Sequence, residues 1–187
     1  MILASQSPRR KELLSLITED FKVIPAKGEE ILPDDIAPND AVILLSRQKA
    51  REIYTEYKNE LIIASDTVVA VDGEILGKPR DRADAVAMLT SLSGRSHTVV
   101  SGVAVTVRGV TRTDASVTTV RVQEIPREEI ERYVDSGEPM DKAGAYGIQG
   151  RFSVFVEGID GCYFGVVGLP VNTLSNLYLE ATGERLS

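Results

Sequence analysis

The sequence predicts an α/β fold, in which a mixed sheet is divided into two lobes by a central cleft. Segments typical of strands and helices alternate through the first half of the chain, and β-forming residues dominate the start of the second half. The chain has 187 residues, of which 43% are hydrophobic. That is enough for one domain, 1–187, with a sizeable core.

The N-terminal segment is typical of a strand, a tight turn and a helix. Ile2-Leu3-Ala4 is the apolar strand, and a helical pattern follows Ser5-Gln6. Ser7 suits the N-cap, and Pro8 suits the first helical position because its missing N–H would be unpaired there. The next predicted elements are a loop at Leu32–Asp40, a helix at Ala41–Tyr57 and a buried strand at Leu61–Val71.

Turn and cap signals predict the rest of the chain. Asp72-Gly73 marks a hairpin turn, and Asp81 suits the N-cap of a helix that Ser93-Gly94 ends. The later predicted elements are strands at Thr98–Val107 and Ser116–Val122, a helix at Pro126–Val134, a loop at Gly144–Gly150, strands at Phe152–Val156 and Tyr163–Val167, and a helix from Leu169 to Thr182.

Composition restricts the classes of function. Asp and Glu number 28 against 21 Lys and Arg, giving a net charge of −7. Bulk charge therefore does not favour nucleic acid, and any phosphate must bind in a local basic pocket. We expect no membrane segment, because no apolar run approaches the length of a span. One cysteine, Cys162, fits a reducing compartment, so we expect a cytoplasmic protein.

The residue inventory also restricts the chemistry. His97 is the only histidine, which excludes zinc sites built from several His and Cys. A structural role for it is the commoner case. Carboxylates, lysines, arginines and an oxygen-bound divalent metal such as Mg²⁺ or Mn²⁺ remain.

The first helix begins with two adjacent arginines. Arg9 and Arg10 oppose the helix dipole, because cations prefer the other end of a helix. A phosphate held by backbone N–H groups and guanidinium groups would relieve this conflict. The alternative is a basic helix start that is simply solvated.

An aspartate interrupts the apolar strand at Leu61–Val71. Asp66 is costly there unless it is paired, hydrogen-bonded or bound to a metal, and strands disfavour Asp. We therefore predict that Asp66 binds a metal or accepts a proton from an attacking water. The alternative is a carboxylate that caps a neighbouring loop. Lys78, held between Gly77 and Pro79, is suited to a phosphate, although an exposed loop lysine is commoner.

Four further residues are candidates for the site. Glu30, in the pair Glu29-Glu30, is suited to a divalent ion, and Lys49 is of interest only if its helix borders the cleft. Gln149 lies within the glycine-rich stretch 144–150 and offers both a donor and an acceptor, which reading the edge of a pyrimidine requires. Tyr146 has a stacking or a core role.

Together these segments resemble the Maf family of nucleotide pyrophosphatases. The match spans nearly the whole chain, and its most specific part is Asp-Lys-Ala-Gly-Ala-Tyr-Gly-Ile-Gln-Gly at 141–150. The resemblance implies a fold related to inosine-triphosphate pyrophosphatases. It also implies a divalent metal, hydrolysis of the α–β phosphoanhydride bond of nucleoside triphosphates, and assembly as a homodimer.

The resemblance further implies the branch acting on dTTP and UTP. Arg9-Arg10, Thr67 and Ile148-Gln149-Gly150 match that branch, whereas the branch acting on 7-methyl-GTP differs at all three places. Ser65, where the dTTP/UTP branch often has Gly, is a small departure. By the same resemblance, Asp66 is the proton acceptor; Arg9, Thr67 and Gln149 set specificity; Ser5, Arg10, Lys49 and Lys78 surround the triphosphate; and Glu30 suits the metal.

The sequence thus predicts a cytoplasmic, metal-dependent dTTP/UTP pyrophosphatase with pyrimidine nucleoside triphosphates as partners and with no nucleic acid or membrane partner. Two alternatives stay open: a nucleotide-binding regulatory protein that affects septum formation, and the 7-methyl-GTP branch.

Overall fold

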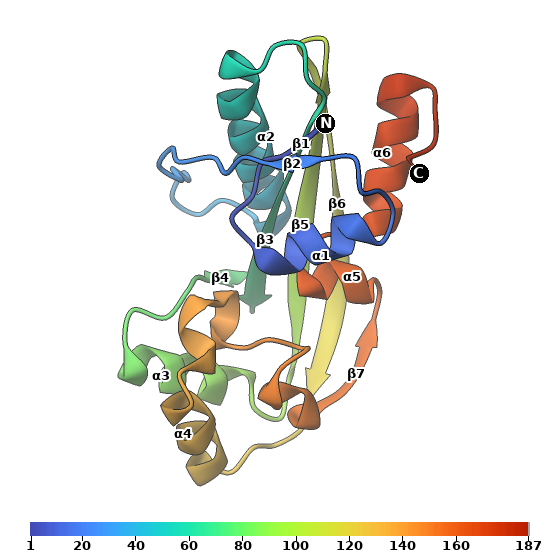
Figure 1. Ribbon diagram of the computed structural model, residues 1–187. Helices are drawn as coiled ribbons and strands as arrows, with labels where there is room; N and C mark the ends of the chain where they lie inside the picture. The colour runs from blue at the N-terminus through green and yellow to red at the C-terminus, as the bar shows by residue number, and fades with distance from the viewer. Residues whose placement is uncertain (187) are drawn as a thin grey trace.

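A long, twisted mixed sheet forms the axis of the molecule (Figure 1). The computed structural model describes residues 1–186. The strand order is β2-β1-β3-β5-β6-β7, with β4 paired to β3. The strands are β1 (Ile2–Leu3), β2 (Lys22–Val23), β3 (Ile62–Val71), β4 (Glu74–Leu76), β5 (Ser96–Val107), β6 (Val110–Val122) and β7 (Val156–Asp160). β1 runs parallel to β2 and β3, and the other pairs are antiparallel.

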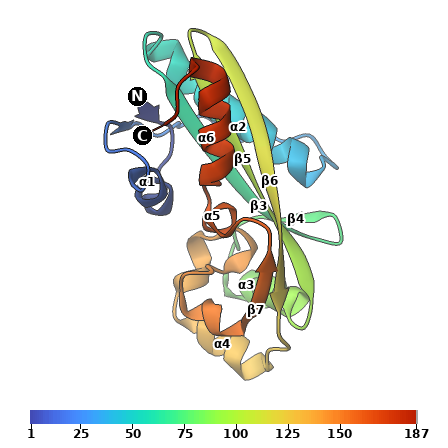
Figure 2. The same cartoon turned by 90° about the vertical axis from the view of Figure 1, so that its right-hand side faces the viewer.

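Helices cover both faces of this sheet and gather into two lobes at its ends (Figures 1 and 2). The α-helices are α1 (Pro8–Ser15), α2 (Pro38–Glu56), α3 (Arg82–Leu92), α4 (Arg127–Asp135), α5 (Tyr163–Val167) and α6 (Val171–Thr182). Three 3-10 helices lie between α4 and β7, at Glu138–Asp141, Ala143–Ala145 and Arg151–Phe155. Among the helices within residues 1–186, none is both long and apolar enough to cross a bilayer.

Alternation along β3 sends its side chains to two separate cores. Ile62 and Ala64 pack with Ala50 and Ile53 of α2 on one face. Ile63, between them, packs on the other face with residues of α1 and α6. A third core fills the second lobe, where α3, α4 and the 3-10 helices meet the far ends of β3, β5 and β6. Because successive side chains along a strand point to opposite faces, this alternation also decides which face each polar residue of β3 lies on.

Several local signals act as the sequence predicts. Ser7 caps α1 by accepting the N–H of Arg10, and Asp81 caps α3 by accepting the N–H of Asp84. Asp72 and Gly73 both have positive φ, at 54° and 86°, in the turn that joins β3 to β4. A turn with two positive φ angles matches the twist of an antiparallel hairpin.

The predictions for the segment 152–167 are wrong. Phe152 begins no strand but lies in a 3-10 helix, and β7 starts at Val156. Tyr163–Val167, predicted as a strand, is helix α5. Gly161, at φ 130°, turns the chain away from β7, and the sulfur of Cys162 then accepts the N–H of Gly165 and caps the new helix. Local capping therefore overrides the β propensity of these residues.

Two boundaries also differ from the sequence prediction by three residues or more. α2 begins at Pro38 rather than at Ala41, because proline takes the first helical position. β6 begins at Val110, and the connection from β5 is the two-residue turn Arg108-Gly109. The polar residues expected in a longer turn instead continue the pairing with β5.

Candidate active site

The candidate site is a cleft at an open edge of β3. β1 pairs with β3 only at Ile62 and Ile63, and β4 pairs only from Val69 onward. Between these contacts, residues 64–68 pair only with β5 among the strands of residues 1–186. The cleft lies against this gap, has a volume of about 1170 Å³, and is lined from both lobes.

All nine residues singled out in the sequence line this cleft: Ser5, Arg9, Arg10, Glu30, Lys49, Asp66, Thr67, Lys78 and Gln149. They come from the turn before α1, from α1, α2 and β3, and from three loops. The structure therefore brings together residues that lie up to 144 positions apart, from Ser5 to Gln149.

The cleft is basic although the chain is acidic. Six basic side chains line it against four acidic ones. The basic residues are Arg9, Arg10, Lys27, Lys49, Lys78 and Lys142, and the acidic residues are Glu30, Asp66, Glu138 and Asp141. This local excess of positive charge is the basic pocket that a phosphate ligand requires in a chain of charge −7.

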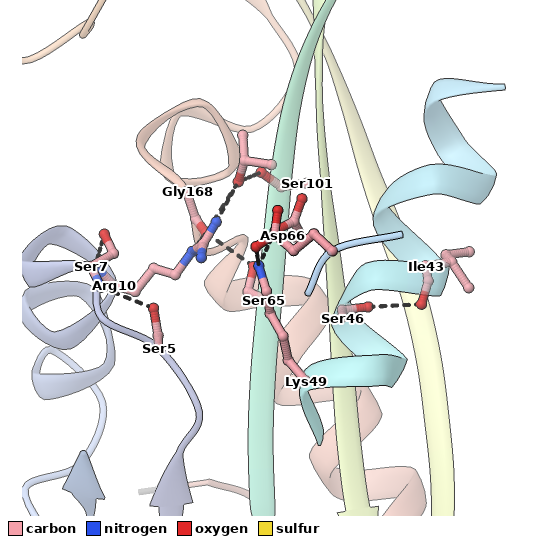
Figure 3. Close-up of polar contacts among 12 residues, drawn as sticks. Ser5, Ser7, Arg10, Ile43, Ser46, Lys49, Ser65, Asp66, Ser101 and Gly168 are labelled. Carbon is pink, nitrogen blue, oxygen red and sulfur yellow. Dashed lines mark hydrogen bonds and ion pairs between the residues drawn. The ribbon is translucent and has the colours of Figure 1, made fainter. Parts of the chain in front are cut away.

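Asp66 faces α2 and is paired there. Its carboxylate is only 10% exposed and forms an ion pair with the Lys49 ammonium, which reaches it from the middle of α2 (Figure 3). The same ammonium lies 2.8 Å from Oε1 of Glu30, on the loop before α2. Burial opposes ionisation of Glu30, but the hydrogen bond and charge of Lys49, with the charges of Lys78 and Arg10, lower the pKa of this carboxyl below its ordinary value.

The opposite face of β3 carries a hydrogen-bond network centred on a carbonyl. The oxygen of Gly168 accepts from Nε of Arg10 at 2.9 Å and from the hydroxyl of Ser65 at 3.0 Å (Figure 3). Nη2 of Arg10 also donates to Oγ1 of Thr67 at 3.2 Å. Burial lowers the pKa of Arg10 from its ordinary value, with the charge of Asp66 opposing this effect.

The network continues from Thr67 into the core. Oγ1 of Thr67 lies 2.7 Å from the hydroxyl of Ser101, which donates to the carbonyl of Gly165 in α5. Since Ser101 uses its one proton on Gly165, Thr67 is the donor to Ser101. The chain of donors therefore runs from Arg10 through Thr67 and Ser101 to α5.

The N-terminus of α1 faces the same cleft. Ser5 is buried at 5% exposure and its hydroxyl accepts the N–H of Ser7. Arg9 reaches across to the second lobe, where its Nη1 lies 3.9 Å from the carboxylate of Asp141. The predicted phosphate-binding turn therefore borders the cleft, and one of its two arginines contacts each wall.

The loop that carries Gln149 is built into the second lobe. Gln149 itself is exposed on the cleft, whereas Tyr146 is buried against Phe152 and shares a 2.7 Å hydrogen bond with Nε2 of His97. Tyr146 thus has the core role, and His97 supports it from β5. Below the loop, the Glu138 carboxylate accepts the N–H of Arg151 and the hydroxyl of Tyr133.

Sequence reasoning missed the residues that support the site. Gly168, Ser101 and Glu138 touch the predicted residues or their loop, but only Ser101 gives a signal in the sequence. It is a hydroxyl within the apolar run Val99–Val105, which is the same kind of cost that marked Asp66.

A divalent metal fits the donor set only in part. Within residues 1–186, no three His, Cys, Asp or Glu side chains come together as a metal-binding group. The carboxylates of Asp66 and Glu30 lie on either side of one ammonium. Mg²⁺ is commonly held by one or two carboxylates, with substrate phosphates and waters as its other ligands. These two side chains therefore fit a metal that is shared with a phosphate ligand.

Comparison with known proteins places the chain in a family. Residues 1–181 match the family described as Maf-like protein. The chain belongs to the Maf family. Two relatives named dTTP/UTP pyrophosphatase are 49% identical to it: the protein of Agathobacter rectalis, with 96% of this chain and 95% of the relative covered, and that of Carboxydothermus hydrogenoformans, with 95% of each covered. The protein of the same name from Bacillus velezensis is 45% identical over 91% of this chain and 90% of its own.

A solved structure shares the fold of this Maf protein. It is described as a HAM1 protein from Coxiella burnetii, and it matches with a TM-score of 0.51, 16% identity, and coverage of 96% of this chain and 98% of that one. The fold expected from the sequence, a mixed α/β fold related to that of inosine-triphosphate pyrophosphatases, is thus confirmed at the level of architecture.

Proposed function

We propose that this Maf protein hydrolyses dTTP and UTP to the nucleoside monophosphate and pyrophosphate. The observation that carries the proposal is the position of Asp66: a shielded carboxylate at an open strand edge, inside a basic cleft that joins two lobes. Curated relatives at 45–49% identity, which cover most of this chain and carry this activity in their names, support it.

The cleft residues have different roles in this reaction, according to the chemistry of their side chains. Arg10, Lys49 and Lys78 neutralise the triphosphate, whose negative charge shifts toward the leaving pyrophosphate as the bond breaks. Asp66 accepts a proton from the attacking water, and the α–β phosphoanhydride bond breaks, leaving its electron pair on the departing group. The proton acceptor, Asp66, is therefore next to one of these cationic side chains, because Lys49 contacts it in the free protein.

Asp66 and Glu30 would hold a divalent cation such as Mg²⁺ or Mn²⁺ together with the triphosphate. When bound, this cation supplies positive charge that stabilises phosphate oxygens as charge develops on them. The protein contributes the two carboxylates, and the Lys49 ammonium contacts both of them in the free protein.

Gln149 is the residue we assign to base recognition. It is exposed on the wall of the cleft formed by the second lobe, and its amide provides a donor and an acceptor together. The imide edge of uracil or thymine presents the complementary pattern. Arg9 and Thr67 complete the residues that we propose set specificity.

The test is a comparison of kcat/KM across separate substrates: dTTP, UTP, CTP, GTP, ITP and 7-methyl-GTP. We expect dTTP and UTP to be preferred, and Gln149→Ala to reduce that preference by about tenfold, because a lost base contact is worth roughly 1–3 kcal/mol. Preferred turnover of 7-methyl-GTP would contradict the assignment to pyrimidines. An equal loss on all triphosphates in the variant would remove Gln149 from base recognition.

A further inference from the structure

The Lys49 ammonium lies where a cation shared by two carboxylates would lie. It pairs with Oδ1 of Asp66 (Figure 3). It also lies 2.8 Å from Oε1 of Glu30. The side chains of Lys49 and Asp66 are only 16% and 10% exposed, so solvent screens their contact little. A metal ion bound by both carboxylates would therefore occupy the present position of the ammonium, so the two cations cannot be there together.

The chain alone offers few other ligands for such an ion. No third His, Cys, Asp or Glu joins Asp66 and Glu30 among residues 1–186. A hard divalent cation takes six or more oxygen ligands, so most of its shell must come from water or from a phosphate ligand. The protein without nucleotide therefore has a site that is both incomplete in ligands and already neutralised in part.

Displacement of the ammonium requires another anion near it. A charge that leaves its partner inside a shielded site is strongly destabilised unless a new partner compensates. A triphosphate in the same cleft is such a partner, because Lys49 lines that cleft together with Arg10 and Lys78. The long, flexible stem of lysine allows its charge to move between neighbouring anions.

We propose that Lys49 couples metal binding to nucleotide binding. In the free protein its ammonium occupies the two carboxylates in place of a metal. A bound triphosphate draws the ammonium onto its own oxygens and so frees Asp66 and Glu30 for the cation. Metal and nucleotide then bind together, each strengthening the other. This inference rests on the proposed function for the identity of the nucleotide, but the exclusion between Lys49 and a metal does not depend on turnover.

The experiment is a titration of the full-length protein with Mn²⁺, followed by electron paramagnetic resonance of free Mn²⁺. It is run without nucleotide and with the non-hydrolysable analogue α,β-methylene-UTP, whose own affinity for Mn²⁺ is measured separately. For the unaltered protein we expect weak binding of Mn²⁺ alone and binding about tenfold tighter or more with the analogue, which is typical of coupled sites.

Three variants identify the source of the coupling. Lys49→Met removes the charge but keeps an unbranched side chain, and we expect it to bind Mn²⁺ alone about tenfold tighter than the unaltered protein. Lys49→Gln is the second variant, to be used if the first does not fold. Lys27→Met removes a cleft charge that we assign neither to the triphosphate nor to the two carboxylates, and we expect it to keep the coupling.

The proposal is overturned if the Lys49 variant binds Mn²⁺ alone no tighter than the unaltered protein. It is also overturned if the analogue leaves the Mn²⁺ affinity of the unaltered protein unchanged while binding to the cleft. A protein that hydrolyses UTP but shows neither effect rejects the coupling alone. A protein that shows tighter Mn²⁺ binding in Lys49→Met but hydrolyses no triphosphate rejects the proposed function alone.

Discussion

The two faces of β3 hold their polar residues at the cleft in different ways. On the α2 face, Asp66 depends on charge, through Lys49 and, behind it, Glu30. On the α5 face, Ser65 and Thr67 depend on neutral hydrogen bonds to a carbonyl and to Ser101. An ion pair can exchange its partner when a charged ligand enters, whereas buried hydrogen bonds that are broken leave unsatisfied groups.

One face of β3 therefore carries the residue that we assign to the reaction, and the other face carries residues that support the site. Because side chains alternate along β3, successive residues serve opposite faces, and Asp66 faces the reacting side between two residues of the supporting side. Arg10 is the exception, since it brings a charge to the supporting face and spends two of its donors on Gly168 and Thr67. The account predicts that substitutions on the two faces change different measurements.

The largest effect is expected on the charged face, from Asp66→Asn. Asparagine keeps the shape of the side chain but cannot accept the proton, so kcat for UTP should fall by about 10²–10⁴-fold. Unfolding in urea should remain cooperative, because the fold does not depend on the proton transfer. Near-normal turnover in this variant would remove Asp66 from the mechanism.

The supporting face is tested by Gly168→Ala. Gly168 has a φ of 130°, which strains any residue with a Cβ, and the new methyl would make ordinary contacts with Nε of Arg10 at 3.6 Å and Oγ1 of Thr67 at 3.7 Å. We expect the free energy of unfolding to fall by about 1–3 kcal/mol, and kcat/KM for UTP to fall because the strained backbone shifts the carbonyl that accepts from Arg10 and Ser65.

Gly73→Ala is the matched control for this substitution. Gly73 also has a positive φ, at 86°, but no atom of the described residues lies within 4 Å of the position that its Cβ would take. It should lose stability to a similar degree and keep its kcat/KM. Equal losses of kcat/KM in the two variants would show that the carbonyl of Gly168 has no special role.

His97, in the second lobe, is a buried base whose pKa is shifted by burial rather than by a charged neighbour. Burial lowers the pKa of His97 to about 4, below its ordinary value of 6.5. The unfolded chain therefore binds more protons than the folded protein between these values, so stability falls as the pH falls from about 6.5 to 4. At pH 5 this residue alone should cost about 2 kcal/mol relative to pH 7.

His97→Asn keeps a hydrogen-bonding group near Tyr146 but does not titrate. Urea unfolding of both proteins at pH 7 and pH 5 isolates the contribution of His97. We expect the loss of stability on acidification to be smaller in the variant by about 2 kcal/mol. The same pH dependence in both proteins would contradict a buried, neutral His97.

The smallest effect is expected from Ser101→Ala, at the end of the donor chain. The carbonyl of Gly165 and the hydroxyl of Thr67 would each lose a partner, for a cost of about 1–2 kcal/mol in stability. Because Arg10 still holds Thr67 at 3.2 Å, kcat/KM should change only a few-fold. A loss of activity as large as that of Asp66→Asn would show that the supporting face takes part in the chemistry.

The sequence predicts the charged face better than the supporting one. Asp66 can be recognised in the sequence because burying a carboxylate in an apolar strand is unfavourable unless the carboxylate has a partner. Lys49 and Glu30 depend on the resemblance to a family, since a charged helix residue and an acidic loop are common on any surface. The pairing of all three requires the packing of α2 on β3, which no local pattern encodes.

The supporting face is hidden from the sequence for two reasons. Its central acceptor is a backbone carbonyl, which every residue carries, and Gly168 is 158 positions from Arg10. The segment before it was also the one predicted wrongly, as a strand instead of α5, because its β-forming residues outweigh the cap that Cys162 provides. By contrast, the caps and turns at Ser7, Asp81 and Asp72-Gly73 depend only on neighbours, and these predictions are confirmed.

The most direct test of the account is phosphorus NMR of UTP during turnover by the unaltered protein with Mg²⁺. The account predicts that the triphosphate signals are replaced by those of UMP and pyrophosphate, which requires cleavage of the α–β bond. The appearance of UDP and inorganic phosphate would contradict the assignment of the bond. No turnover of UTP or dTTP, with nucleotide binding intact, would favour a regulatory protein that binds nucleotides without hydrolysing them.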